Sequence, residues 1–153
     1  MKGKTMKKLF IYYSYTGNGD LVAERMAVQG YDLRAVKKKK KMPKSFFWGI
    51  MTGGFLASIG KKDKLVDFDE NIGDYDEIVV GSPIWNARFA SPINTVLSKL
   101  NFEGKKLSFL LYSGSGEAPK AVERIKKEYP TAKIVLLKEP KKYPDELEKL
   151  KYL

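Results

Sequence analysis

The chain alternates between short apolar segments and longer amphipathic ones. Five segments rich in β-branched and aromatic residues predict buried strands: Leu9–Tyr13, Asp32–Val36, Glu77–Gly81, Leu107–Tyr112 and Lys133–Leu137. Most of these segments are continuously apolar rather than alternating, a pattern typical of a parallel sheet that is covered on both faces.

Helical periodicity separates most of these predicted strands. After Ser91, a predicted N-cap, and Pro92, a predicted first-turn residue, apolar residues recur at positions 93, 96, 97 and 100. Comparable patterns complete a set of four predicted helices: Asp20–Gln29, Pro92–Leu100, Ala118–Tyr129 and Asp145–Leu153.

Strands alternating with helices predict an α/β fold, a single doubly wound parallel sheet of five strands with helices on both faces. The length of 153 residues and the lack of a visible linker or repeat predict one domain over residues 1–153. Such sheets bind ligands beyond the carboxyl ends of their strands. This rule directs attention to the loops after the first, third and fourth strands: Ser14–Gly19, Ser82–Pro92 and Ser113–Glu117.

The first of these loops carries the strongest chemical signal in the chain. It reads Ser14-Tyr15-Thr16-Gly17-Asn18-Gly19, between a predicted strand and a predicted helix. Backbone N–H groups in such a turn converge, and the helix N-terminus adds its positive dipole end there. The glycines of this loop do not follow the dinucleotide fingerprint, and the loop has no lysine followed by Ser or Thr, which a nucleotide-triphosphate loop requires. The loop therefore predicts a cradle for a phosphate monoester bound without metal, and the alternative is an ordinary helix-capping turn.

The amino-acid composition excludes many catalytic schemes. The chain has no Cys and no His, so it has no disulfide, thiol nucleophile, Ser-His-Asp triad or imidazole metal ligand. We predict no catalytic side chain and no metal site, and we expect any chemistry to belong to a bound cofactor.

The formal net charge of +11 admits two interpretations. It is either a solvated basic surface or a means of attracting an acidic partner protein. No nucleic-acid-binding motif accompanies it, so we expect no nucleic acid partner. We expect a cytoplasmic protein, because no signal peptide is visible and the longest apolar stretch, residues 46–59, is too short to span a bilayer.

Residues 45–60 interleave aromatic residues with glycines where a further helix is expected. The segment either packs irregularly on the sheet or forms an exposed aromatic docking patch beside the lysines at 37–44.

Three motifs together make the chain resemble the flavodoxin family over nearly its whole length. The Ser14–Gly19 loop is similar to the family's phosphate loop, Thr/Ser-x-Thr-Gly-Asn-Thr. The segment Gly81-Ser82-Pro83-Ile84-Trp85-Asn86-Ala87, followed by Pro92, resembles the family's tryptophan loop, and Ser113-Gly114-Ser115-Gly116 resembles its third, serine- and glycine-rich flavin loop.

The resemblance implies the strand order 2-1-3-4-5 and the cofactor FMN. It assigns the FMN phosphate to Ser14, Tyr15, Thr16, Gly17, Asn18 and Gly19. It places the flavin ring between the other two loops, with Trp85 stacked on one face. The ring's remaining contacts would come from Ser82, Pro83, Ile84, Asn86, Ala87, Ser113, Gly114, Ser115 and Gly116.

This chain departs from the family pattern in three respects. Gly19 stands where the family usually has a hydroxyl residue, Ala87 stands where it usually has glycine, and the chain is basic where typical members are acidic.

Three functions stay open at this point. The first is a small FMN protein that carries electrons to and from redox partner proteins, which the charge predicts to be acidic. The second is an NAD(P)H-dependent FMN or quinone oxidoreductase on the same fold, and the third is a module that has lost flavin and acts through its basic surface. The sequence leaves the oligomeric state open.

Overall fold

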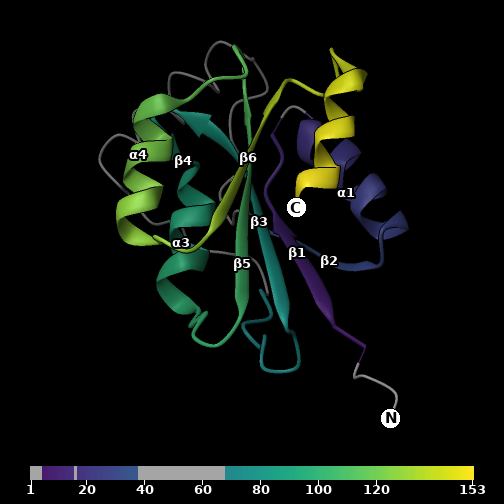
Figure 1. The fold of residues 1–153 in the computed structure, drawn as a ribbon, viewed down its shortest axis with the longest axis vertical. Coiled ribbons are helices and arrows are strands. Elements are labelled where there is room, and N and C mark those ends of the chain that lie inside the picture. The colour runs from purple at the N-terminus through teal and green to yellow at the C-terminus, as the bar shows by residue number, and fades with distance from the viewer. Residues whose placement is uncertain (1–4, 16, 38–67) are drawn as a thin grey trace.

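The computed structural model describes residues 5–15, 17–37 and 68–153 (Figure 1). Thr16, the lysine run from Lys38 onward and the aromatic and glycine-rich segment at 45–60 lie outside these residues. The predictions made for them therefore stay predictions.

Five parallel strands form the main sheet in the order β2-β1-β3-β5-β6. This is the predicted order 2-1-3-4-5, because β4 lies off the main path of the sheet. Strand β1 pairs with β2 on one side and β3 on the other, so that Lys8 lies opposite both Tyr31 and Glu77. The strands span Lys8–Tyr12 (β1), Tyr31–Ala35 (β2), Glu77–Trp85 (β3), Lys106–Ser113 (β5) and Lys133–Lys138 (β6).

Strand β3 is longer than predicted, and it leads into a short strand that the sequence analysis missed. Residues Ser82–Trp85, expected in a loop, continue β3 beyond Gly81. The chain then reverses, and β4 (Arg88–Phe89) pairs antiparallel with Ile84 and Trp85. The predicted flavin loop is thus the tip of a β-hairpin. A strand of two residues has too few positions to show a period in the sequence.

Helices cover both faces of the sheet, as predicted. Helix α1 (Asn18–Val28) and the C-terminal helix η1 (Pro144–Tyr152) lie on one face, and α3 (Ser91–Lys99) and α4 (Pro119–Glu128) lie on the other (Figure 1). Successive residues of β1 alternate between the two cores: Leu9 and Ile11 pack toward α3 and α4, and Phe10 packs toward α1 and η1. Burial on both faces explains why the strand is continuously apolar.

Two details of the helices differ from the expectations. Ser91 is a helical residue and not the N-cap, which is Ala90; Ala90 accepts hydrogen bonds from the backbone N–H groups of Ile93 and Asn94. The C-terminal helix is a 3₁₀ helix. With about 3 residues per turn, this form aligns Leu147 and Leu150, three positions apart and both buried, on the side that faces the sheet.

Among the described residues, no helix is both long enough and apolar enough to cross a membrane.

Candidate functional site

The three predicted loops meet at one edge of the sheet. The strands β1, β3 and β5 are parallel neighbours, and Tyr12, the last residue of β1, shares a register position with Gly81 of β3 and Leu110 of β5. Beyond that level the backbone N–H of Tyr13 donates to the Gly81 carbonyl, 3.1 Å away. The loops that follow these strands therefore lie side by side, as the ligand-binding edge of such a sheet requires.

In the first loop, Ser14–Gly19, which we call the cradle, two backbone amides converge on a single oxygen atom. The N–H groups of Gly17 and Gly19 both donate to Oγ of Ser14, each at 3.1 Å. Gly17 has a left-handed φ of 96°, and α1 begins at the next residue, Asn18. An oxygen atom held by convergent amides at a helix N-terminus is the environment that a phosphate oxygen prefers. The local geometry thus fits an anion cradle.

Close packing explains why Gly19 replaces the family's usual hydroxyl residue. A β-carbon at Gly19 would lie 2.8 Å from Cβ of Ser14 and 3.0 Å from the Tyr13 carbonyl oxygen. The hydroxyl of Tyr112 would be 3.2 Å away. That hydroxyl is fully buried and has no hydrogen-bond partner among the described residues, and its burial raises its pKa. A polar donor from β5 therefore lies under the cradle where the loop itself lacks a hydroxyl.

A residue that the sequence analysis missed, Lys141, also borders the cradle. Its backbone N–H donates to Oδ1 of Asn18 at 2.9 Å, across 123 positions of sequence. A β-carbon at Gly17 would lie 3.4 Å from the Lys141 ammonium nitrogen, Nζ. The strand order alone would not place this residue here, because β6 is three strands away from β1. The available signal was the C-terminal helix, which packs on the same face as α1 and draws the chain after β6 toward the cradle.

The second loop is the hairpin Ile84–Phe89. Its two turn residues, Asn86 and Ala87, have φ values of 49° and 60°, as a type I′ turn requires. Asn tolerates this left-handed conformation, but Ala does so only with strain. The hairpin thus holds the turn in place by strand pairing rather than by glycine.

Trp85 leads into this turn and is half-buried. Its ring packs edge-on against Tyr15, with ring centroids 6.1 Å apart, and against Tyr13 at 6.3 Å. Tyr15 belongs to the cradle, so this contact joins the two loops directly. At the base of the hairpin, Oγ of Ser82 donates to the Pro83 carbonyl and accepts from the backbone N–H of Ala90.

The third loop, Ser113–Glu117, is ordered by its own serines. Oγ of Ser113 accepts from the N–H of Gly116 at 2.9 Å, and Oγ of Ser115 accepts from the N–H of Glu117 at 3.2 Å. Gly116 has a left-handed φ of 80°, and a β-carbon there would meet Lys138 at 2.9 Å. Gly114, in contrast, is exposed, and a β-carbon there would have no neighbour within 4 Å.

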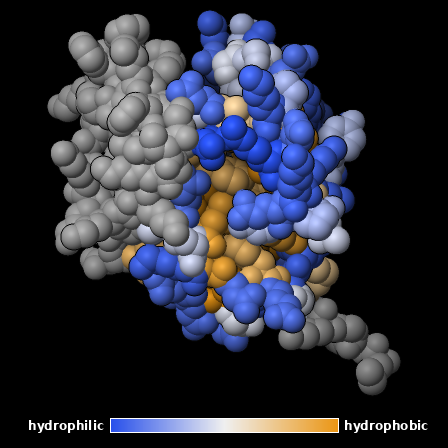
Figure 2. All heavy atoms as spheres, turned by 90° about the vertical axis from the view of Figure 1, so that its left-hand side faces the viewer, coloured by the Kyte–Doolittle hydropathy of each residue, from blue (hydrophilic) through white to orange (hydrophobic). Residues whose placement is uncertain are grey.

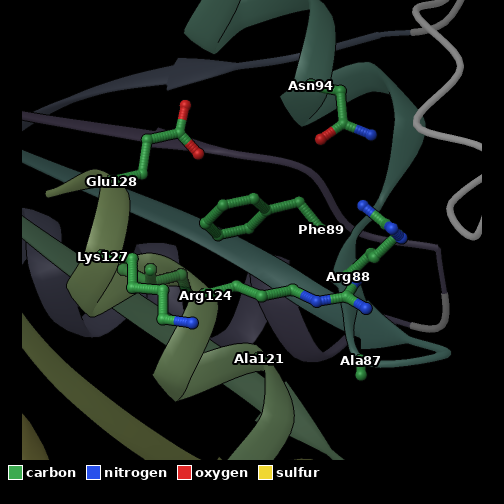
Figure 3. A pocket seen from close by; sticks show the side chains of 9 residues that line it. Ala87, Arg88, Phe89, Asn94, Ala121, Arg124, Lys127 and Glu128 are labelled. Atoms are coloured by element: carbon green, nitrogen blue, oxygen red, sulfur yellow. The ribbon is translucent and has the colours of Figure 1, made fainter.

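A cavity of about 450 Å³ lies beside the hairpin, on the face of the sheet that carries α3 and α4 (Figure 3). Figure 2, which views this side of the molecule, shows a hollow strip of hydrophobic surface framed by hydrophilic residues. The cavity is lined by Ala87, Arg88, Phe89, Asn94, Ala121, Arg124, Ile125, Lys127 and Glu128.

Among the described residues, no group of three or more Asp and Glu side chains is arranged to hold a metal ion.

Comparison with known protein families agrees with this architecture. A family model described as Flavodoxin matches residues 7–144. The chain belongs to the flavodoxin family. No curated protein sequence matches this flavodoxin.

Solved structures share the flavodoxin's fold. A flavoprotein from Lactobacillus acidophilus NCFM, solved in complex with FMN, has a TM-score of 0.67 and 23% identity, with 85% of this chain and 90% of that chain covered. A protein from Bacteroides eggerthii DSM 20697 has a TM-score of 0.68 and 23% identity, covering 85% of this chain and 88% of that one. A third, from Bacteroides uniformis ATCC 8492, has a TM-score of 0.61 and 26% identity over 86% and 90% of the two chains.

The flavodoxin's three motifs thus lie at one edge of its sheet, as the sequence predicted. Tyr15 and Trp85 are in ring contact, and Gly19 lies against the Tyr112 hydroxyl. The roles of the individual residues toward a cofactor stay predictions, and Thr16 lies outside the described residues.

Proposed function

We propose that this flavodoxin binds FMN at the carboxyl edge of its sheet and transfers electrons between partner proteins in the cytoplasm. The observation that carries the proposal is the convergence of the Gly17 and Gly19 amides on one oxygen at the start of α1. Family membership and the FMN complex of the Lactobacillus acidophilus flavoprotein support it.

The residues present fit an FMN phosphate. In this proposal the amides of Gly17 and Gly19, the side chains of Ser14 and Asn18, and the undescribed Thr16 hold its oxygens. The Ser14 hydroxyl would turn from accepting the two amide N–H groups to donating to the phosphate. Lys141 adds a positive charge at the rim, which the loop itself lacks. The buried Tyr112 hydroxyl supports the loop from below.

The flavin ring would lie between the hairpin and the third loop. Trp85, positioned by Tyr13 and Tyr15, would cover one face of the ring and exclude water from it. Backbone groups of Ile84, Asn86, Gly114 and Gly116 would bond the ring edge. FMN, once bound, supplies the redox chemistry by accepting and releasing electrons one or two at a time.

The test is a comparison of FMN with riboflavin, measured by flavin fluorescence quenching or calorimetry. Because riboflavin lacks the phosphate that the cradle would hold, we expect riboflavin to bind at least about 10-fold more weakly, the equivalent of one charge-assisted hydrogen bond or more. Equal affinities would contradict the assignment of the cradle.

The basic charge supports acidic redox partners. Surface charge acts mainly on the rate of encounter, and salt shortens its reach to about 10 Å at 0.1 M. We expect electron transfer with an acidic donor protein to slow as salt is added. Rates that do not change with ionic strength would instead mean that the lysines only solvate the surface.

A second candidate, an NAD(P)H-dependent oxidoreductase, is favoured by one observation. A reductase needs a substrate pocket beside its flavin, and the cavity next to the hairpin carries Arg88 and Arg124 in its wall. Anaerobic mixing of the FMN-loaded protein with NADPH separates the two functions. Rapid bleaching of the flavin indicates a reductase, and slow or absent bleaching indicates a carrier.

A further inference from the structure

The cavity beside the hairpin contains positive charge that its described surroundings do not neutralise. Neither Arg88 nor Arg124 has an ion pair or a hydrogen bond within residues 5–15, 17–37 and 68–153. Lys127, in contrast, lies 3.7 Å from Glu123 in a pair whose side chains are 78% and 69% exposed. Its charge is therefore balanced in solvent, whereas the two arginines are available to a ligand.

The arrangement of the side chains concentrates this charge at one end of the cavity. Figure 3 shows Arg124 extending from α4 toward the hairpin, so that its guanidinium group lies on the same side of the Phe89 ring as that of Arg88. Glu128, the acidic residue among the described lining residues, lies toward the opposite end. Two guanidinium groups at the same end of the cavity repel each other unless an anion lies between them.

The rest of the lining is apolar and firmly supported. The Phe89 ring packs on the fully buried Phe109, with ring centroids 5.2 Å apart, and Ala121 and Ile125 are buried residues of α4. Asn94 also lines the cavity, and its Nδ2 atom is buried and has no hydrogen-bond partner among the described residues. A buried donor without a partner is costly, so the Asn94 amide would gain free energy by turning toward a ligand acceptor in the cavity.

We propose that this cavity is a second binding site, which takes a small organic anion with a flat or apolar body. The body would lie on Phe89 and Ile125, and its carboxylate or phosphate would be held by the guanidinium groups of Arg88 and Arg124. Arginine suits this task because its planar fork matches both kinds of anion. A volume of about 450 Å³ is that of a site for an organic molecule rather than for a bare inorganic ion.

The site is coupled to the proposed flavin edge through the hairpin. Arg88 pairs directly with Trp85 across the two strands, so an anion bound to Arg88 touches the same short hairpin that carries Trp85. This point rests on the proposed function: with FMN bound as proposed, the ligand would lie next to the flavin, where a substrate or an effector of electron transfer would bind.

Calorimetric titration of the full chain, saturated with FMN so that the cradle is filled, tests the proposal. The probes are phenyl phosphate, benzoate and uncharged benzyl alcohol. We expect one or both anions to bind and benzyl alcohol to bind far more weakly, and the better anion identifies the preferred acidic group. Arg124→Gln should weaken anion binding roughly 10-fold or more, the usual effect of losing a hydrogen bond to a charged group.

Lys126→Gln is the matched control, because it removes the same charge from the same helix but does not line the cavity. Equal weakening by the two substitutions would show a general charge effect and overturn the proposal, as would benzyl alcohol binding as tightly as the anions. If the chain does not take up FMN, the proposed function fails. The comparison of Arg124→Gln with Lys126→Gln on the chain alone still decides the second site.

Discussion

The cradle and the hairpin meet at the same edge of the sheet, yet they satisfy the demands of a tight turn in opposite ways. The cradle uses glycine where neighbouring atoms leave no room, since a β-carbon at Gly19 would approach Cβ of Ser14 to 2.8 Å. The hairpin places Asn86 and Ala87 in the left-handed region without any glycine. Steric exclusion makes a residue indispensable, whereas a strained φ only adds a cost that strand pairing can offset.

The largest expected effect is at Gly19. Gly19→Ala should destabilise the fold by about 1–3 kcal/mol, because the new methyl group would lie 2.8 Å from Cβ of Ser14 and 3.0 Å from the Tyr13 carbonyl oxygen. The same change should disrupt the convergence of the cradle amides and weaken FMN binding. Thermal unfolding and FMN titration measure the two effects.

Gly114→Ala is the control for Gly19→Ala, because a β-carbon there has no neighbour within 4 Å. We expect it to leave both stability and FMN affinity nearly unchanged. If the two substitutions change stability and FMN affinity equally, then close packing at Gly19 is not the reason that the cradle requires glycine there.

Lys141 tests whether a positive charge beside the cradle contributes to FMN binding. Lys141→Ala should weaken FMN binding up to about fivefold, the usual size of an exposed ionic interaction, and the loss should shrink as salt is added. Riboflavin, which lacks the phosphate, should bind the variant and the parent chain equally.

Lys142→Ala removes the same charge from the next residue, whose ammonium lies near the Tyr143 ring, 5.8 Å from its centroid. Its FMN affinity should therefore change little. A loss as large as that of Lys141→Ala would mean that the whole basic surface, and not Lys141, attracts the phosphate.

Ala87 tests the other half of the comparison, the strained turn of the hairpin. Ala87→Gly should stabilise the protein by about 0.5–1 kcal/mol, because glycine removes the left-handed strain at a φ of 60° while adding some chain entropy. Urea unfolding measures the change. Asn86→Gly should stabilise the protein less, because Asn tolerates this conformation. A greater stabilisation by Asn86→Gly than by Ala87→Gly would contradict the assignment of the strain to Ala87.

The smallest effect concerns the C-terminal segment that brings Lys141 to the cradle. The pKa of Glu146 is lowered by its hydrogen bond with the Lys149 ammonium and by the backbone N–H of Lys138, 2.7 Å away. A lowered pKa means that the ionised form stabilises the fold above its ordinary pKa of 4.5 and that this contribution fades as the pH falls below it.

Glu146→Gln should therefore cost about 0.5 kcal/mol at pH 7 and nothing in strong acid, as measured by unfolding at a series of pH values. Glu146→Gln should affect the structure of the cradle, which the C-terminal segment borders, and should leave the hairpin unchanged. A cost that does not vary with pH would mean that packing, rather than charge, holds the segment.

The sequence predicted the sheet well, because buried strands carry their signal locally. All predicted strand boundaries but one lie within one residue of the observed ones, and the exception is the carboxyl end of β3. There, pairing with Arg88 and Phe89 of β4 extends β3, and no local sequence pattern predicts a strand of only two residues.

The candidate site was less predictable than the sheet, because much of it depends on contacts between distant segments. The convergence at Ser14 follows from the local turn and could be expected. The approach of Lys141 and the buried Tyr112 hydroxyl depend on how distant segments pack, and so does the exclusion of a side chain at Gly19.

The hydrogen bond between Asn18 and Lys141 has a consequence for how the protein is made. It closes a loop of 123 positions, and β1 cannot gain both its neighbours until Glu77 and the rest of β3 are present. Parallel pairings between distant segments form slowly, because the entropy of loop closure is lost before the contacts form. During synthesis, the cradle can therefore be completed only after Lys141 has left the ribosome. A chain truncated before Lys141 would carry every motif of the phosphate loop and still lack part of its rim.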